Sequence, residues 1–302
     1  MRIFENTNFD FLGKRRYAYV FSGTVILLGL ISLVTRGVDT GIDFLGGTEL
    51  VVDTGVPIPV GEVRGALEGP LGSTPEVKLF GAEDQLLIRT VAGGDPDSLQ
   101  SLIVGTLGAR FEGAEPAVLS VNSVGPRFAD DLKRGAIWSV LASLLVIFAY
   151  IAVRFEWRYS VGAVLCLAHD VLFTLGLFSL LHGFVPFSLQ IDQTIIAAFL
   201  TIVGYSINDT VVVFDRVREY ANLFKTERFD RVLNRAINST LSRTTLTSLT
   251  TLLVVFVLFL FGGEAIKGFA FALLVGIGIG TYSSIFVASP VAYELSQRGG
   301  KV

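Results

Sequence analysis

The ionisable side chains best placed to do chemistry lie inside the most apolar parts of this sequence. Asp209 falls within VGYSINDTVVVF, a stretch that continues an apolar run from Thr194. His169 and Asp170 stand near the middle of a second apolar run. A charged side chain at the centre of a bilayer costs at least ~2.5–3.5 kcal/mol unless it is paired. Each of these residues is therefore a candidate for binding or transferring a proton.

The residues around Asp209 fit a proton-binding site on a helix. Tyr205 and Ser206 stand four and three positions before it and so share its face. Asn208 precedes it directly, and Gly204 would let a neighbouring helix approach closely. In the structural alternative, Asp209 only hydrogen-bonds its neighbours and holds a helical bundle together.

Arg243 stands at the start of a later apolar run and is the candidate partner of Asp209. On a helix, four polar side chains form a stripe along one face: Arg243, Thr247, Thr250 and Thr251. Because lipid disfavours such a stripe, we expect it to face the bundle interior or a water-filled path. Arg243 could neutralise Asp209 and then release it when a proton arrives. The alternative is an arginine whose side chain extends to the membrane surface.

The pair His169 and Asp170 offers a second set of proton-carrying groups. Histidine titrates near neutral pH, and a carboxyl group in a membrane can also exchange a proton, so either residue could carry one. Adjacent residues point about 100° apart on a helix, so we expect the two not to address one site. The alternative is a polar pair that only packs two helices together.

The composition as a whole is that of an integral membrane protein. Of the 302 residues 51% are hydrophobic and 17% are charged, and the mean hydropathy is +0.62, which is too apolar for an ordinary soluble domain. One cysteine, Cys166, and two histidines leave little from which to build a disulfide framework, a zinc site or a haem site. We therefore expect no metal and no cofactor, and we expect Cys166 to belong to the apolar core.

Six segments are long and apolar enough for a helix that crosses a bilayer, which needs about 20 residues. They are 17–34, 136–153, 160–181, 194–214, 244–261 and 268–288. The first is expected to be an uncleaved spanning helix, because no Ala-x-Ala cleavage pattern follows it. The long interruption after it predicts an external domain with a lead-in helix at 35–134, followed by spans two to six within 135–288.

Basic residues predict the orientation of these spans. Lys and Arg collect in residues 1–16, 154–159, 215–243 and 289–302, whereas the loop 182–193 has none. Because basic segments near span ends stay in the cytoplasm, we predict that both termini and the loop 215–243 are cytoplasmic. The sequence therefore predicts a multi-pass protein of the cell inner membrane, in direct contact with the lipid bilayer.

The segment 35–134 is predicted to be a small α+β domain on the periplasmic side. Its apolar patterns and turn signals give the order β-α-β-β-α-β, which is that of a ferredoxin-like fold. The stretch SVGPRFADDLKRGAIWS predicts a helix that begins outside at Pro126 and continues into the second span, where it could transmit motion. An ordinary amphipathic lead-in at the bilayer surface is the alternative. The domain is rich in Asp and Glu, which argues against anionic partners such as nucleic acid.

Four motifs, in matching order, resemble those of the SecF family. They are GIDFLGGTEL after the first span, SVGPRFADDL before the second, LAHDV in the third and VGYSINDTVVVFDRVRE in the fourth. The likeness covers essentially the whole chain, and the motif in the fourth span is its most specific part.

This resemblance implies a function in protein export. SecF is the partner of SecD in the bacterial Sec machinery, and the two form a complex of two six-span halves, similar to transporters of the resistance-nodulation-division superfamily. The complex associates with the SecYEG channel and uses the proton-motive force to promote the export and release of unfolded polypeptides on the periplasmic side. In that family an aspartate of the fourth-span motif and an arginine at the start of the fifth span are implicated in proton transport. Those roles would fall on Asp209 and Arg243, with a further essential carboxylate in SecD.

Two other functions remain open from the sequence. A proton-coupled exporter of small amphiphiles from the same superfamily would keep the membrane carboxylate, but it would usually need larger external domains to enclose its substrate. A membrane scaffold would use the polar residues only for helix packing. An ATPase is disfavoured because the sequence has no GxxxxGK[ST] loop. We therefore expect a translocation subunit rather than an enzyme.

Overall fold

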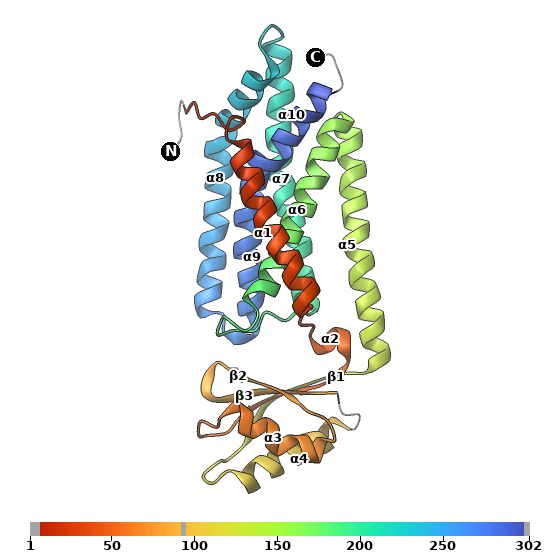
Figure 1. Ribbon diagram of the computed structural model, residues 1–302, viewed down its shortest axis with the longest axis vertical. Coiled ribbons are helices and arrows are strands. Elements are labelled where there is room, and N and C mark those ends of the chain that lie inside the picture. Colours follow the sequence, from red (N-terminus) through yellow and green to blue (C-terminus); the bar gives the residue numbers. More distant parts are fainter. Residues whose placement is uncertain (1–6, 92–94, 299–302) are drawn as a thin grey trace.

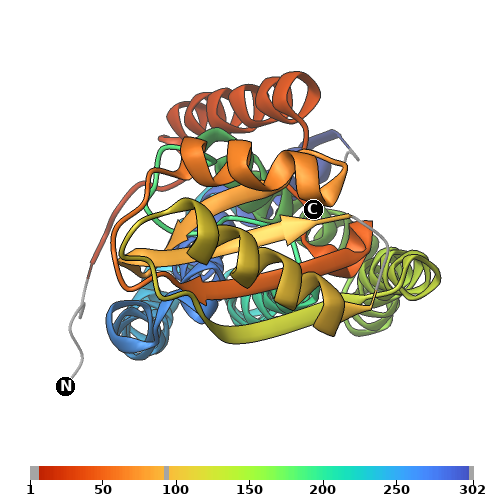
Figure 2. The same ribbon diagram turned by 90° about the horizontal axis from the view of Figure 1, so that it is seen from below.

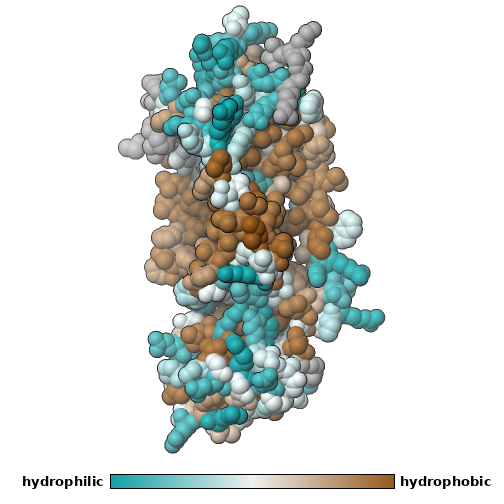
Figure 3. Space-filling model, in the orientation of Figure 1, coloured by the Kyte–Doolittle hydropathy of each residue, from teal (hydrophilic) through white to brown (hydrophobic). Residues whose placement is uncertain are grey.

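The computed structural model describes residues 7–91 and 95–298, which form a helical bundle with a small α+β domain at one end (Figure 1). Within this described part, six helices are long and apolar enough to cross a membrane, which agrees with the six predicted spans. They are α1 (Arg15–Arg36), α5 (Pro126–Arg154), α6 (Trp157–Leu181), α7 (Gln193–Leu223), α8 (Phe229–Phe261) and α9 (Glu264–Ser283). The helix α9 continues through a π-helical segment, Ser284–Ala288, into α10 (Ser289–Arg298). On the face seen in Figure 3, a hydrophobic band crosses the bundle between two more hydrophilic ends.

Two spanning helices extend beyond the apolar runs that predicted them. The segment 215–243, expected to be a cytoplasmic loop, holds the end of α7, a short connection and the beginning of α8. Ion pairs along the helix, such as Arg216 to Glu219 at 2.8 Å, support a polar helix outside the apolar zone. Hydropathy therefore marks where the apolar zone ends and not where the helix ends.

The lead-in helix is continuous, as predicted. Pro126 occupies the first turn of α5, where its missing N–H leaves no hydrogen bond unmade, and the helix runs without a break to Arg154. Only Ala129 and Ile151 of this helix are buried. The helix α5 thus lies at the edge of the bundle and connects the α+β domain directly to the membrane-spanning part (Figure 1).

The α+β domain is built on a four-stranded antiparallel sheet. Its strands are β1 (Gly47–Asp53), β2 (Glu76–Phe80), β3 (Ala82–Thr90) and β4 (Ala117–Val124), in the spatial order β2-β3-β1-β4. The helices α3 (Val60–Leu71) and α4 (Pro96–Arg110) cover one face of the sheet (Figure 2). Alternate strand residues such as Leu50 and Ile88 pack there against Leu67 and Ile103. The order of elements is the predicted β-α-β-β-α-β.

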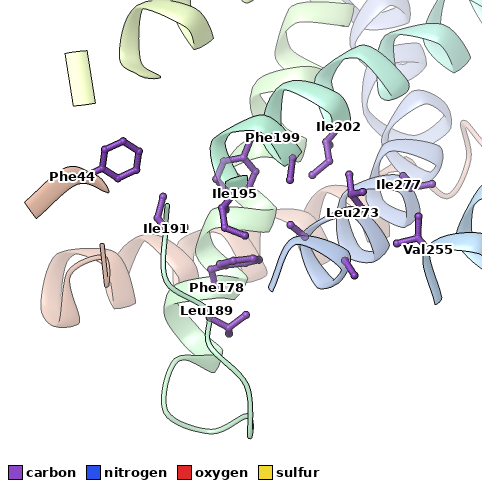
Figure 4. Close-up of a cluster of buried hydrophobic side chains, with 13 residues drawn as sticks. Phe44, Phe178, Leu189, Ile191, Ile195, Phe199, Ile202, Val255, Leu273 and Ile277 are labelled. Atoms are coloured by element: carbon purple, nitrogen blue, oxygen red, sulfur yellow. The ribbon is translucent and has the colours of Figure 1, made fainter. Parts of the chain in front are cut away.

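The domain is joined to the bundle through the connection that follows α1. Thr40 forms a parallel bridge with Ile191, and Gly41 N–H donates to the carbonyl of Ile191 at 2.9 Å. The one-turn helix α2 (Ile42–Leu45) follows directly. Its Phe44 begins a buried hydrophobic cluster that continues through Ile191, Ile195 and Phe199 to α9 (Figure 4). The start of α7 is therefore packed against the segment that leads into the sheet.

Candidate functional site

Asp209 lies at the meeting point of three helices. Its side chain is 4% exposed, and its Oδ2 accepts a long hydrogen bond of 3.4 Å from Ser248 Oγ of α8. Ser248 in turn accepts a hydrogen bond of 2.6 Å from Thr281 Oγ1 of α9. Two hydrogen bonds thus connect Asp209 of α7 to Ser248 of α8, and Ser248 to Thr281 of α9. We call Asp209, Ser248 and Thr281 the Asp209 chain.

Glycines on α9 bring these helices close enough for that chain to form. A Cβ atom on Gly276 would overlap the side chain of Ile202 on α7, and one on Gly280 would lie 3.1 Å from Ser206 Cβ. For Gly278, by contrast, no atom of the described residues lies within 4 Å of a Cβ placed there. Of these three glycines of α9, Gly276 and Gly280 therefore allow the close contact between α7 and α9.

Arg243 does not form an ion pair with Asp209 in this structure. Its side chain is exposed on α8 and, among the described residues, makes neither a hydrogen bond nor a salt bridge. Its positive charge still acts on Asp209 through space. The predicted pair is thus present as two separate groups, with Ser248 as the direct partner of the carboxylate.

Two threonines of the stripe on α8 do not face the interior of this chain, and the other expectation, that the stripe faces a water-filled path, stays a prediction. Thr247 and Thr250 are exposed, and their hydroxyls donate to carbonyls of their own helix at 2.9–3.0 Å. This internal bonding explains how the hydroxyls can leave the core without unmet hydrogen bonds. Thr244 and Ser248, four residues apart on an adjacent face, are the buried pair. Their position in the same Ser/Thr run was the signal that could have identified them.

The neighbours of Asp209 on α7 also make other contacts than expected. Tyr205 Oη donates to Thr251 of α8 at 3.3 Å, and Ser206 Oγ donates to Asp170. Asn208 is exposed, and no atom of the described residues lies within 4 Å of a Cβ placed on Gly204. The close helix contact expected at Gly204 is therefore not made within the described part of the chain.

His169 and Asp170 form one site, which corrects the expectation that adjacent residues would separate. Asp170 is fully buried, and its Oδ1 lies 2.9 Å from His169 Nδ1. Its Oδ2 accepts from Ser206 Oγ at 2.6 Å and from Ser283 Oγ at 2.8 Å. The reach of the two side chains overcomes the angle between their Cα–Cβ bonds. Cys166, expected to be plain core, also takes part, because its Sγ donates to Ser283 at 3.1 Å.

A third polar group lies where α7 meets the α+β domain. Asp192 caps α7, since its Oδ1 accepts from the backbone N–H of Ile195 at 2.8 Å. Burial raises the pKa of Asp192 above its ordinary value, and the negative charge of Asp43 adds to this. Asp43 itself accepts from the backbone N–H of Gln193 at 2.9 Å. Two carboxylates therefore hold the first turn of α7.

The sheet contributes a buried arginine to the same junction. Arg89 of β3 lies 3.0 Å from both Glu49 and Glu76 and donates to the carbonyl of Thr40 at 3.2 Å. It also hydrogen-bonds Gln190, in the connection before α7. In residues 7–91 and 95–298, no group of three His, Cys, Asp or Glu side chains is arranged to hold a metal ion.

The sequence is similar to known proteins along most of its length. The profile described as "Protein export membrane protein SecD/SecF, C-terminal" matches residues 104–298. The protein translocase subunit SecF of Rhodothermus marinus is 64% identical over 298 residues, which cover 99% of this chain and 96% of that protein. SecF of Haemophilus influenzae is 38% identical over 291 residues, 96% of this chain and 86% of that protein. These relatives are named as translocase subunits and not as enzymes.

A solved structure is similar along nearly the whole chain. The crystal structure of SecDF, a translocon-associated membrane protein from Thermus thermophilus, matches with a TM-score of 0.86 and 35% identity. The match covers 97% of this chain but only 39% of that chain. The present chain therefore spans about two fifths of the SecDF polypeptide.

Proposed function

Because the chain belongs to the SecF family of protein translocase subunits, we propose that it couples the proton-motive force to protein export. In this proposal it works in the inner membrane as the partner of SecD, beside the SecYEG channel. It promotes the release of unfolded polypeptides on the periplasmic side, and both of its termini are cytoplasmic. The small α+β domain is the periplasmic domain, and we assign it to the ferredoxin-like class on its strand order β2-β3-β1-β4.

The observation that carries the proposal is the environment of the Asp209 side chain. A carboxyl group buried among three helices has one long hydrogen bond, and a guanidinium acts on it without contact. When ionised, Asp209 can attract Arg243. When it is protonated, that attraction is lost and the Asp209 chain through Ser248 and Thr281 remains. The two forms therefore favour different arrangements of α7, α8 and α9, which is what a proton-driven switch requires.

The magnitude of the driving force is adequate for such a switch. Moving one elementary charge across the membrane releases about 2.3 kcal/mol per 100 mV. A change of that size shifts a two-state equilibrium by between one and two powers of ten. One proton is therefore enough to bias the helices, although not to make the change all-or-none.

A partner chain is supported by the polar surface of α7 and α8. Asn208, Arg243, Thr247 and Thr250 are exposed in this chain, although they lie in or beside the apolar spans. Such side chains in spanning helices normally face protein or a water-filled cavity. We propose that SecD covers this surface, and the SecDF polypeptide is long enough to supply it, since this chain matches only 39% of it.

The experiment that tests the proposal is gradient-dependent export with Asp209→Asn as the only copy of this subunit. We expect the variant to assemble with SecD and to lose the gradient-driven component of export, because Asn cannot take up a proton. Arg243→Gln should cause a comparable loss. Asp215→Asn is the matched control, since Asp215 is an exposed carboxylate six residues further along α7 that pairs with Arg154 at 3.0 Å.

The same measurement separates the alternatives. A scaffold would tolerate Asp209→Asn, because amide and carboxyl groups have similar shapes. An assembled variant that keeps its full gradient-driven export would therefore refute the proposal. Export of small amphiphiles, the second alternative, is disfavoured by the size of the domain between α1 and α5, which is too small to enclose a substrate alone.

A further inference from the structure

A second buried ionisable cluster lies on the side of α7 that faces α6. It consists of Asp170 and His169 of α6, Ser206 of α7 and Ser283 of α9. Asp170 is fully buried and His169 is 8% exposed. No Lys or Arg side chain in the described part of the chain pairs with this carboxyl group. We call these four residues the Asp170 cluster.

The titratable groups that face Asp170 are few. His169 is bonded to it directly, and Cys166 reaches it through Ser283. The Tyr282 ring lies 6.3 Å from the His169 ring between centroids, but its hydroxyl is directed to Ala18 and Ser22 of α1. Asp209 of α7, three residues after Ser206, is hydrogen-bonded to Ser248 of α8 and not to the Asp170 cluster. His169 is thus the group able to balance the charge of Asp170.

One nitrogen of the imidazole has no partner. His169 Nε2 is buried and makes no hydrogen bond to any described residue, and its ring lies near the rings of Phe173 and Tyr282. Buried polar atoms in native proteins are nearly always bonded, so an exception calls for an explanation. An imidazole with one nitrogen on a carboxylate and the other free is able to accept a proton at the free position.

We infer that His169 and Asp170 form a second proton-binding site of this chain, linked to Asp209 through α9. This inference rests on the proposed function and assigns it a second group. In the starting state Asp170 is ionised and the neutral imidazole donates from Nδ1. A proton that binds at Nε2 allows the Nδ1 proton to pass to Asp170 Oδ1. The product is a neutral acid and a neutral imidazole protonated at Nε2, so one proton has been taken up.

The hydrogen bonds of Ser206 and Ser283 change when Asp170 takes up that proton. The ionised carboxylate accepts from Ser206 and Ser283, whereas a neutral acid needs fewer donors. Ser283 Oγ has a second acceptor within reach, the carbonyl of Gly280 at 3.1 Å. Its hydroxyl can therefore move from the side chain of Asp170 to the backbone of α9 when the charge disappears.

The link to Asp209 lies in the sequence of α9. Thr281 belongs to the Asp209 chain and Ser283 to the Asp170 cluster, two residues apart. The π-helical segment begins immediately afterwards, at Ser284. Single turns of π-helix inside α-helices occur frequently at functional sites, where the hydrogen-bond pattern can change locally. The end of α9 is therefore bonded directly to Asp170 and through Ser248 to Asp209, so that the proton on one carboxyl group affects the other.

The test uses the complete complex with SecD in lipid, in which Asp170→Asn is compared with the wild type and Asp209→Asn. Infrared difference spectra between high and low pH measure the C=O stretch of protonated carboxyl groups. We expect Asp170→Asn to lose one pH-dependent carboxyl band that Asp209→Asn retains, and to lose the gradient-driven component of export. Ser179→Ala is the control, because it removes another buried hydrogen bond of α6, to Ser32 at 2.8 Å, without touching the cluster. It should keep both the band and the export.

The outcomes distinguish the inference from the proposed function. If Asp170→Asn keeps every pH-dependent band, Asp170 does not bind a proton and the inference is overturned, even if Asp209→Asn has abolished driven export. If Asp209→Asn exports normally, the proposed function fails first. Should Asp170→Asn not assemble, His169→Gln takes its place. It should move the pH midpoint of the same band, and an unmoved midpoint would contradict the inference.

Discussion

At the scale of residues, the two buried aspartates differ in how firmly they are held. Asp170 accepts hydrogen bonds from two serines and lies against an imidazole nitrogen, whereas Asp209 has one bond of 3.4 Å. A carboxylate that accepts several hydrogen bonds is stabilised in its charged form, whereas one that accepts few can exchange its partner more easily. Asp209 is therefore the group with the greater freedom to alter its partner.

The sequence was sufficient to identify the charged groups but not their hydroxyl partners. An aspartate in an apolar run is conspicuous because its burial is unfavourable. A serine such as Ser248 is not, because Ser and Thr in a spanning helix can bond to their own backbone. Only the helix packing shows that Ser248 and Ser283 point to carboxylates while Thr247 and Thr250 do not.

Asp192 provides a prediction that depends on pH. Because burial raises the pKa of Asp192, the native state binds its proton more readily than the unfolded state does. The stabilisation is therefore present at acid pH and is lost as the pH rises through the native pKa. We expect Asp192→Asn, which keeps a good helix cap, to raise the thermal midpoint at neutral pH, with a difference that shrinks towards acid pH.

The matched variant Asp192→Ala separates the charge from the cap. It removes the oxygen that accepts from Ile195 N–H and should be about 1 kcal/mol less stable than Asp192→Asn at every pH. A midpoint difference between wild type and Asp192→Asn that does not vary with pH would contradict the account of Asp192.

At the scale of elements, the number of spanning helices and the continuous helix α5 could be predicted, but helix ends and helix faces could not. Hydropathy responds to the lipid-facing length, so it detected all six spans. It did not detect that α7 and α8 continue as polar helices, nor that a π-helical segment follows α9. Those features depend on side-chain ion pairs and on packing against other helices.

The contact between α7 and α9 yields a prediction about two glycines on one helix. Gly276→Ala places a Cβ inside the side chain of Ile202, and overpacking of this kind costs about 1–3 kcal/mol. Gly278→Ala meets no atom within 4 Å and should be as stable as the wild type or more so. Thermal unfolding of the purified protein compares the two. Equal midpoints for both variants would show that α9 does not rely on this close approach.

At the scale of the whole molecule, the order of the domain elements was predictable, but the way the domain sits on the bundle was not. Alternating apolar residues predict strands, so β-α-β-β-α-β followed from the local sequence. The junction is formed by residues far apart in the chain, such as Thr40 with Ile191 and Arg89 with Gln190. No local pattern in the sequence indicates such pairs.

A substitution of Arg89 tests how far the stability of the domain depends on that junction. Arg89→Ala would leave Glu49 without its ion-pair partner, whereas Glu76 would keep Lys78 at 2.6 Å. Breaking a largely buried pair such as Arg89 with Glu49 costs about 3–5 kcal/mol. We expect a lower thermal midpoint and faster hydrogen exchange in residues 39–42 and 189–192. Arg64→Ala, at an exposed arginine of α3, is the control and should change neither. Unchanged exchange in Arg89→Ala would mean that the junction does not depend on this network.

The most direct test of the central claim, that Asp209 carries the proton, is a measurement of proton flux. The complex with SecD would be reconstituted in liposomes, a pH gradient imposed, and the internal pH followed for the wild type, Asp209→Asn and the control Asp215→Asn. The account predicts that Asp209→Asn abolishes the protein-dependent flux while Asp215→Asn conducts normally. A flux in Asp209→Asn equal to that of the wild type would contradict it.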